Sequence, residues 1–332
     1  MEDHLISVII PVYNTAAYLP RCLDSILNNT YQNLEVLCVN DGSPDNSLEI
    51  LKAYAARDSR VKVIDQENGG ISVARNRAMA QASGQYIAFV DSDDWVHSRY
   101  FEILLNGLQT HNADAAVCRE REVWSYEEDT VLEGDVCAFR ELTRQQIFQD
   151  HSAKRRVWGR LYRRDLVGQH RFQPEIKLSE DIVFNLGVLF SRNDVKLIIT
   201  EAPMYYYLMR SNSAVHTLLG DQLEPVVKWY LHQIPLVDDE VGAYYIVSAL
   251  KALYSWRYHA ALLRNARDRA EIRSLLRQTM PKLWRSDHVS VKEKIKCTAM
   301  TAVPLLYRGF RIMQDPTLIK WERQMHRKRR EV

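Results

Sequence analysis

The first 120 residues alternate short apolar runs with amphipathic segments, a pattern that leaves few folds open. Four of the runs are continuous and rich in β-branched residues, as expected for strands buried on both faces of a sheet. They are Ile6–Val12, Leu34–Val39, Val61–Asp65 and Tyr86–Val90. Helical segments lie between them: one carries an apolar stripe at Leu19, Cys22, Leu23, Ile26 and Leu27, and others follow Asp45, Ile71 and Ser98. The alternation predicts βαβ units and a mostly parallel sheet.

The sequence pattern after residue 120 predicts a second half of this domain and a separate helical region. The pattern weakens between Arg121 and Asp150, a second apolar region covers 157–209, and the residues beyond Asp221 have a helical pattern. We therefore expect one domain over 1–220, with halves 1–120 and 121–220, and a helical region over 221–332. From Lys251 onward there are 20 Lys and Arg against 7 Asp and Glu, a net charge of +13, which leaves −11 for the first 250 residues because the whole chain carries +2. Two parts with different partners are expected.

Composition excludes several classes of protein. With 332 residues, 46% of them hydrophobic, the chain can bury a substantial core and is not mainly disordered. Its five cysteines form no C-x-x-C pair, which argues against a disulfide framework or a structural zinc site. The amino terminus is acidic where a signal peptide is basic, and no apolar stretch reaches the roughly 18 residues of a membrane span. We expect a cytoplasmic protein.

Polar side chains follow three of the expected strands. Tyr13 and Asn14 come after the first strand, the cluster 40–43 (NDGS) after the second, and 91–94 (DSDD) after the fourth. Ligands of parallel α/β sheets bind beyond the carboxyl ends of the strands. The functional site is therefore expected where these clusters meet.

The 91–94 cluster has three carboxylates, those of Asp91, Asp93 and Asp94. Their mutual repulsion is relieved by a cation, and oxygen ligands of this kind suit Mg²⁺ or Mn²⁺ held together with substrate phosphates. The alternative is an Asp-rich turn with solvated side chains.

Two other segments favour a nucleotide ligand. The string 40–43 is compatible with an ordinary Asx turn, but it is accompanied by the glycine loop 67–70 (ENGG) and by Arg75 in the helix that follows. A guanidinium group suits a phosphate or a ribose.

Four segments resemble, in order and spacing, successive motifs of the family 2 glycosyltransferases with the GT-A fold. They are SVIIPVYN (7–14), VNDGSPDNS (39–47), ENGGISVARN (67–76) and ASGQYIAFVDSDDW (82–95). The resemblance covers roughly the first 215 residues. It implies an α/β fold, GT-A, with a Rossmann-like and mostly parallel central sheet, followed here by a helical, basic C-terminal extension.

The resemblance also implies roles for residues of the four motifs. The donor nucleotide would contact Pro11, Val12, Tyr13, Asp41, Asn68, Arg75 and Ser92. Among these residues, Asp41 would recognise the edge of uracil or another base, and Arg75 would contact the ribose or the diphosphate. Asp91 and Asp93 would hold the divalent cation. Asp94 would contact the donor sugar or share in holding the cation.

Three later segments extend the resemblance. VWGRLY (157–162) is similar to an acceptor-side element, although a packed turn explains it equally well. Glu180-Asp181 resembles the motif that supplies the catalytic base: Asp181 would take the acceptor proton, and Glu180 would orient the acceptor or cap the helix. Ser179 followed by two acids is alternatively an ordinary helix start. In 205–216, Arg210 would neutralise the leaving diphosphate, and His216 would be a third metal ligand or a surface or packing residue.

The function implied is a metal-dependent, inverting transfer of a hexose or N-acetylhexosamine from a nucleotide-diphosphate donor, UDP-linked, to a hydroxyl of a surface glycan or its lipid-linked precursor. Without a Q-x-x-R-W signature, addition of single sugars is favoured. Two other functions stay open: a non-catalytic nucleotide-sugar or glycan-binding protein, and a nucleotidyltransferase. The basic C-terminal region suits an anionic membrane surface at the inner face of the plasma membrane rather than nucleic acid, with a solvated tail or packing on the acidic half as the alternatives.

Overall fold

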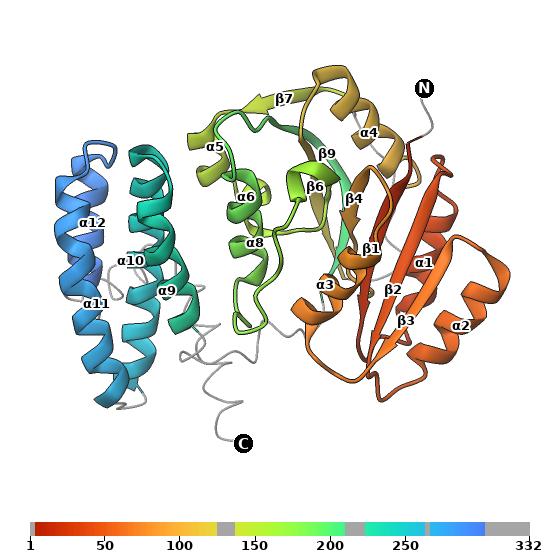
Figure 1. Ribbon diagram of the computed structural model, residues 1–332, viewed down its shortest axis with the longest axis horizontal. Coiled ribbons are helices and arrows are strands. Elements are labelled where there is room, and N and C mark those ends of the chain that lie inside the picture. Colours follow the sequence, from red (N-terminus) through yellow and green to blue (C-terminus); the bar gives the residue numbers. More distant parts are fainter. Residues whose placement is uncertain (1–3, 125–136, 210–222, 263–265, 303–332) are drawn as a thin grey trace. The chain divides into compact units, whose positions relative to one another are not determined.

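The computed structural model describes residues 4–124, 137–209, 223–262 and 266–302. The chain divides into two compact units, 1–211 and 212–332 (Figure 1). The predicted domain border at residue 220 lies outside the described residues. Each unit is considered by itself below.

The elements of the first unit alternate strands and helices as far as residue 89. The strands are β1 (Ile6–Val12), β2 (Leu34–Asp41), β3 (Val61–Gln66), β4 (Tyr86–Phe89), β5 (Trp95–Val96), β6 (Ala115–Val123), β7 (Phe139–Leu142), β8 (Arg160–Arg163) and β9 (Leu197–Leu208). The helices are α1 (Leu19–Leu27), α2 (Ser47–Arg57), α3 (Ile71–Gln81), α4 (Tyr100–His111), α5 (Arg144–Gln149), α6 (His151–Arg155), α7 (Arg164–Val167) and α8 (Glu180–Leu189). All four predicted strands are present, with ends that differ by no more than two residues.

The described strands form one sheet in the order β3-β2-β1-β4-β8-β6-β9-β5, with β7 paired to β9. The first four are parallel: Val8 lies beside Val36 of β2 and beside Ala88 of β4. Val8 belongs to a core shared with α1 and α4, and on the other face α3 contacts β1 and β2. The carboxyl ends of β1, β2 and β4 consequently meet at one edge.

The second half of the sheet is mixed. β8 runs antiparallel to β4, with Ile87 opposite Tyr162, and β6 and β9 are parallel to each other. The Trp158 indole stacks on the Tyr205 ring, with centroids 4.3 Å apart and planes at 11°. This stack and the buried Arg160 show that 157–162 is part of the core, as the packed-turn interpretation expected.

A buried carboxylate ties the parallel strands together. One oxygen of Glu35 in β2 accepts hydrogen bonds from Ser7 Oγ at 2.6 Å, from both the backbone nitrogen and Oγ of Ser83, and from Gly84 N. The other oxygen pairs with Lys62 Nζ at 2.8 Å. Burial acts to raise the pKa of Glu35, but these hydrogen bonds outweigh it and lower the pKa to about 2.

Glu35→Ala is expected to lower the free energy of unfolding at pH 7 by about 3 kcal/mol, because it leaves several buried donors without an acceptor. The pKa of Glu35 is about 2 in the folded chain, below its value near 4.3 when unfolded. Its stabilising contribution is therefore complete above the unfolded pKa and is lost as pH falls toward 2. Urea unfolding at pH 7 and pH 3 tests this, with the exposed Glu49→Ala as control. An equal loss at both pH values would contradict the expectation.

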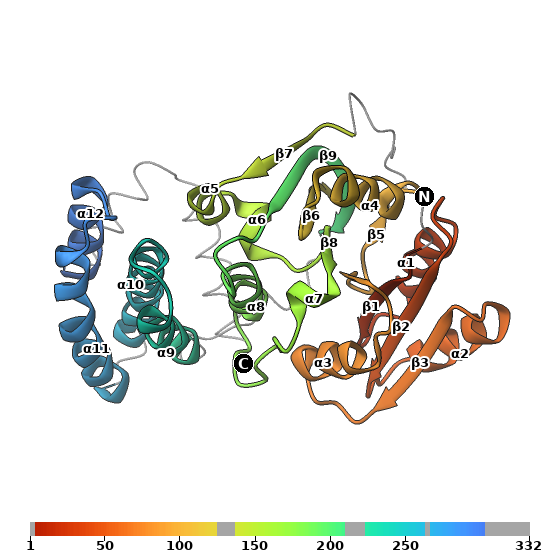
Figure 2. The same ribbon diagram turned by 45° about the horizontal axis from the view of Figure 1, so that its top comes forward.

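The second unit is helical where it is described, as the sequence predicts. Its elements are α9 (Leu223–Gln233), a 3₁₀ turn (Ile234–Leu236), α10 (Asp239–Leu262), α11 (Ala266–Arg285) and α12 (Val291–Ala302). The helix α10 contacts α9, α11 and α12, and the four lie side by side in both views (Figure 2). Leu250, Leu253 and Trp256 of α10 are buried in their common core. No described helix combines the length and the apolar character needed to cross a bilayer.

Candidate active site

Arg75 of α3 joins three acidic side chains that are far apart in the sequence. Its side chain is 1% exposed, and Nη2 lies 3.0 Å from Asp91 Oδ1 at the end of β4. Nη1 lies 2.6 Å from Asp181 Oδ1 and 3.5 Å from Glu180 Oε1, both in the first turn of α8. Burial opposes the charged guanidinium, but the surrounding carboxylates raise the pKa of Arg75. The structure thus brings predicted metal and base residues together around one buried cation.

Two of these carboxyl groups hold protons unusually firmly. Burial, followed by the charge of Asp181, raises the pKa of Glu180 to about 8 despite the opposing effect of Arg75. Burial also raises the pKa of Asp91 to about 6, with Asp93 and Asp181 adding to it while Arg75 lowers it. Perturbed carboxyl groups that converge at a strand end are typical of a catalytic site.

Asp94 is fixed inside the protein. It is 1% exposed, Oδ1 accepts from Leu208 N at 2.9 Å, and Oδ2 accepts from Tyr205 Oη at 2.8 Å. Burial and the charges of Asp93 and Asp91 raise the pKa of Asp94. No described contact tests a role at the donor sugar, so the role of Asp94 stays a prediction.

Asp41 organises the glycine loop. Its Oδ1 accepts from Gln66 Nε2 at 2.7 Å and from Gly69 N at 2.8 Å, and its Oδ2 accepts from Gly70 N at 2.8 Å. Gly42 has a φ of 63°, and a Cβ added there would lie 2.7 Å from Asn68 N. The tight approach of the two loops thus explains the glycine.

The remaining predicted nucleotide and metal residues differ in accessibility. Pro11 and Val12 are buried in β1, whereas Tyr13 is 51% exposed and Asn68 is exposed. Asp93 is half-buried between its acidic neighbours, and the buried Ser92 hydroxyl lies 2.9 Å from Thr15 Oγ1. Arg210 and His216 lie outside the described residues.

The start of α8 differs from an ordinary capped helix. Ser179 occupies the N-cap position with a φ of 65°, in the left-handed region, and its side chain makes no capping hydrogen bond. Asp181 instead uses its second oxygen to accept from Val157 N at 3.4 Å. The local helix-start interpretation therefore accounts for the position of the acids but not for their contacts.

The acidic side chains of the site offer oxygen ligands for a cation. Among the described side chains, no three His, Cys, Asp or Glu come together as a complete metal site. Asp91 and Asp93 nevertheless fit Mg²⁺ or Mn²⁺, because such ions are commonly held by one or two carboxylates together with substrate phosphates. Burial is the main cause of the raised pKa of Asp91, and the charges of Asp93 and Asp181 add to it; a cation would offset their repulsion.

Sequence reasoning missed several residues that position the site. The Tyr205 hydroxyl donates to Asp94 and accepts from Asp91 N at 3.1 Å, and so spans the acidic cluster. Asn76 exchanges two hydrogen bonds with the backbone of Phe172, whose ring lies 5.1 Å from the Arg75 guanidinium carbon. The position of Asn76 next to Arg75 could have indicated a role for Asn76. No local sequence pattern distinguishes Phe172 or Tyr205 as residues of the site.

Comparisons with known proteins agree with this geometry. The model of the family "Glycosyl transferase family 2" matches residues 7–170. The uncharacterized glycosyltransferase EpsJ of Bacillus subtilis is 36% identical over 244 residues, which cover 69% of this chain and 70% of EpsJ.

Two solved structures show the same fold. S. aureus TarS 1-349 in complex with UDP has a TM-score of 0.68 at 22% identity, covering 90% of this chain and 87% of TarS 1-349. The mannosyltransferase PcManGT of Pyrobaculum calidifontis, in complex with GDP-Man and Mn²⁺, has a TM-score of 0.51 at 17% identity, covering 91% and 87%.

The predicted GT-A fold is therefore confirmed, with a sheet whose first four strands are parallel and a helical C-terminal part. The chain belongs to glycosyltransferase family 2.

Proposed function

We propose that the protein is a metal-dependent, inverting glycosyltransferase that moves a hexose or an N-acetylhexosamine from a UDP-linked donor to a hydroxyl of a glycan or lipid-linked acceptor in surface polysaccharide synthesis. The observation that carries the proposal is the Arg75 cluster, which unites Asp91 with Asp181 at the carboxyl edge of the sheet. In this proposal residues 1–120 hold the donor and residues 121–220 supply the base.

At the donor end, Asp91 and Asp93 would hold Mg²⁺ or Mn²⁺. When bound, such an ion offsets the negative charge of the diphosphate. The loop 67–70, fixed by Asp41, presents Asn68 at the surface, and Tyr13 is exposed after β1. In this proposal a nucleoside contacts both side chains.

At the acceptor end, Asp181 removes the hydroxyl proton as the acceptor oxygen bonds to the anomeric carbon. The bond from that carbon to the phosphate oxygen breaks in the same in-line displacement, so the configuration inverts. Arg75 holds Asp181 in place through the 2.6 Å contact. A base positioned in this way contributes roughly 10²- to 10⁴-fold to the rate.

The choice of UDP is supported by TarS structures with UDP and UDP-GlcNAc. Screening UDP-, GDP- and dTDP-sugars for hydrolysis, with Mn²⁺ and with EDTA, tests the function. We expect turnover of a UDP-sugar that needs the metal. Nucleotide-sugar binding without turnover would instead indicate a binding protein. Formation of a nucleoside triphosphate and a sugar 1-phosphate when pyrophosphate is added would indicate a nucleotidyltransferase.

The second unit offers a surface for peripheral membrane contact, which we propose occurs at the inner face of the plasma membrane. Trp284, Val291 and Ile295 are large exposed apolar side chains. Lys294 Nζ donates to the Trp284 carbonyl oxygen at 3.2 Å, which brings the end of α11 beside α12. Exposed cations accompany them: Lys282, Arg285 and Lys292. Apolar tips among cations are typical of helices that lie on anionic bilayers.

The variant Trp284→Ser/Ile295→Ser is expected to bind vesicles of phosphatidylglycerol and phosphatidylcholine less than the parent chain does in co-sedimentation. Leu236→Ser, which removes another exposed apolar side chain of the same unit, is the control. Parent binding should weaken as salt rises, since screening shortens the reach of these charges to about 8 Å at physiological ionic strength. Equal partitioning of parent and double variant would contradict the proposal.

A further inference from the structure

The two proposed cation ligands, Asp91 and Asp93, lie in a turn that follows β4. Before the turn, Val90 N still donates to Ile9 O of β1 at 3.0 Å, as in a continuing strand. The turn itself is closed by a hydrogen bond of 3.1 Å from Asp94 N to Asp91 O. The positions of both ligands therefore depend on what holds this turn to the rest of the protein.

Tyr205 of β9 holds the turn through its hydroxyl group. Asp91 N donates to Tyr205 Oη at 3.1 Å, and Tyr205 Oη lies 2.8 Å from Asp94 Oδ2. The amide can only donate, so the single proton of the hydroxyl goes to the Asp94 carboxylate. The other oxygen of Asp94 accepts from Leu208 N, also of β9, at 2.9 Å. One tyrosine side chain thus bonds to both the first and the last residue of the turn.

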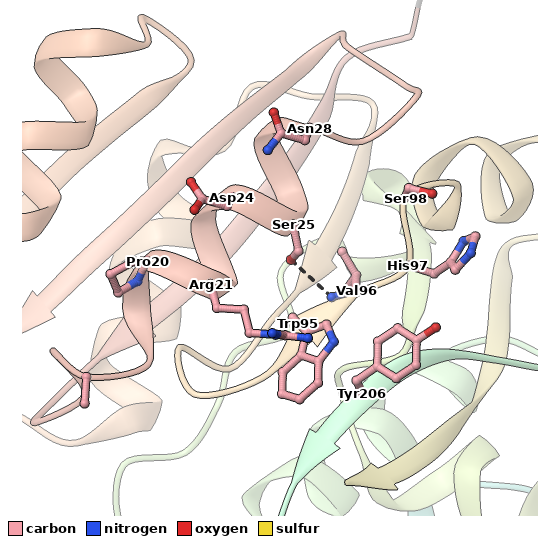
Figure 3. A pocket seen from close by; sticks show the side chains of 11 residues that line it. Pro20, Arg21, Asp24, Ser25, Asn28, Trp95, Val96, His97, Ser98 and Tyr206 are labelled. Carbon is pink, nitrogen blue, oxygen red and sulfur yellow. Dashed lines mark hydrogen bonds between the residues drawn. The ribbon is translucent and has the colours of Figure 1, made fainter. Parts of the chain in front are cut away.

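The chain that follows the turn is anchored to β9 as well. Trp95 pairs with Tyr206, and their rings stack with centroids 5.7 Å apart. Figure 3 shows the two rings side by side in the wall of a pocket, together with the bond of 3.2 Å from Val96 N to Ser25 Oγ of α1. The end of the turn is therefore held firmly, and the Tyr205 hydroxyl extends this hold to its first residue.

Packing fixes the Tyr205 ring in turn. The ring is fully buried, and the Trp158 indole stacks on it with centroids 4.3 Å apart. The pairing of β9 with β6 shifts its register twice between Val117 and Glu120, and Glu120 lies beside Tyr205. Irregularities of this kind are frequent next to active sites, where they redirect a side chain. The hydroxyl is consequently held toward the turn by the sheet and by the aromatic stack.

We propose that Tyr205 is a positioning residue that sets the affinity of the site for its divalent cation. The inference rests on the proposed metal-dependent function, because it concerns an ion held by Asp91 and Asp93. Without the hydroxyl, Asp91 N and the Asp94 carboxylate lose a partner, and the two ligands can leave the geometry that the ion requires. Residues that orient metal ligands typically contribute 10- to 100-fold to metal affinity or activity.

Tyr205→Phe removes the hydroxyl and keeps the ring in its stack on Trp158. Titration calorimetry of the full chain with Mn²⁺, at saturating UDP, should show a dissociation constant for the ion that is about 10- to 100-fold higher than in the parent. In hydrolysis of a UDP-sugar, the apparent KM for Mn²⁺ should rise similarly, while kcat at saturating Mn²⁺ should return close to the parental value. A merely structural role would lower kcat without rescue by excess ion.

Tyr100→Phe is the matched control. Tyr100 of α4 is also fully buried in this unit, but its hydroxyl donates to Arg160 O at 3.2 Å. This variant should keep the parental dissociation constant for Mn²⁺. An unchanged constant in Tyr205→Phe, or an equal rise in both variants, would overturn the inference, as would a loss of turnover that excess Mn²⁺ does not restore.

If Tyr205→Phe does not fold, amide hydrogen exchange in the parent decides. Adding Mn²⁺ to the UDP complex should slow exchange at Asp91 and over 205–208 together, because the hydroxyl ties the turn to β9. Slower exchange in the turn alone would overturn the inference. Failure of the parent to bind Mn²⁺ with UDP, or its full activity in EDTA, would refute the proposed metal dependence itself and the inference with it.

Discussion

Asp93→Ala is expected to reduce metal-dependent turnover of the donor by about 10³-fold or more. A catalytic cation is worth several kcal/mol of transition-state stabilisation, and each 1.36 kcal/mol corresponds to about a factor of ten in rate. Donor affinity should lose its dependence on Mn²⁺ in the same variant, as titration calorimetry with and without the ion would show. The fold should survive, because removing one of three crowded carboxylates relieves repulsion at the strand end.

Asp194→Ala is the matched control, since Asp194 is an exposed aspartate paired only at the surface with Arg192. It should retain parental turnover and metal response. Full activity of the parent in EDTA, or of Asp93→Ala with Mn²⁺, would show that the acidic cluster does not work through a cation.

Asp181→Asn is expected to lower kcat by about 10²- to 10⁴-fold while leaving donor affinity nearly unchanged. The asparagine oxygen can still accept the bond from Arg75, so the positions of α3 and α8 should be kept. A steady-state kinetic series at varied acceptor concentration, together with donor binding, separates the loss of a base from the loss of a binding contact.

Glu180→Gln discriminates between the two neighbouring acids. With a pKa near 8, Glu180 is mostly protonated at neutral pH and is a poor base there. Its amide replacement should therefore retain most of the activity at pH 7. If Glu180→Gln loses its activity while Asp181→Asn keeps it, then Glu180 is the base and the two roles are reversed.

The strands β1, β2 and β4 could be predicted from the sequence because each is a continuous apolar run buried on both faces. The strand β3 was also found, but the expectation that it is buried on both faces was wrong, because β3 lies at the sheet edge and its Lys62 and Asp65 are exposed. The second half of the sheet could not be predicted, because β6, β8 and β9 pair across long stretches of chain and no local pattern states that β8 runs antiparallel to β4. The stack of Trp158 on Tyr205 likewise joins residues 47 positions apart and has no local signal.

The expected strand topology predicted which clusters of polar residues lie close together at the site, but not which side-chain atoms contact one another. The carboxyl ends of β1, β2 and β4 bring the predicted polar residues to one edge, as expected from parallel order. The sequence offered a phosphate or ribose as the partner of Arg75, whereas in the structure its guanidinium contacts three carboxylates. Side-chain partners depend on distances between distant segments, which spacing along the chain does not encode.

The contacts of Arg75 with Asp91, Glu180 and Asp181 decide whether the two halves of the first unit can fold separately. The residues that it joins come from both halves of the first unit, so the nucleotide-side half could not be excised as an independent module. A fragment ending at residue 120 would keep Arg75 and Asp91 but lose Asp181, the nearest counter-ion of Arg75, together with the contact from Glu180. Uncompensated buried charge is strongly destabilising. A chimera that combines the donor half of one family member with the acceptor half of another would therefore fold only if it keeps the arginine and all of its acidic partners.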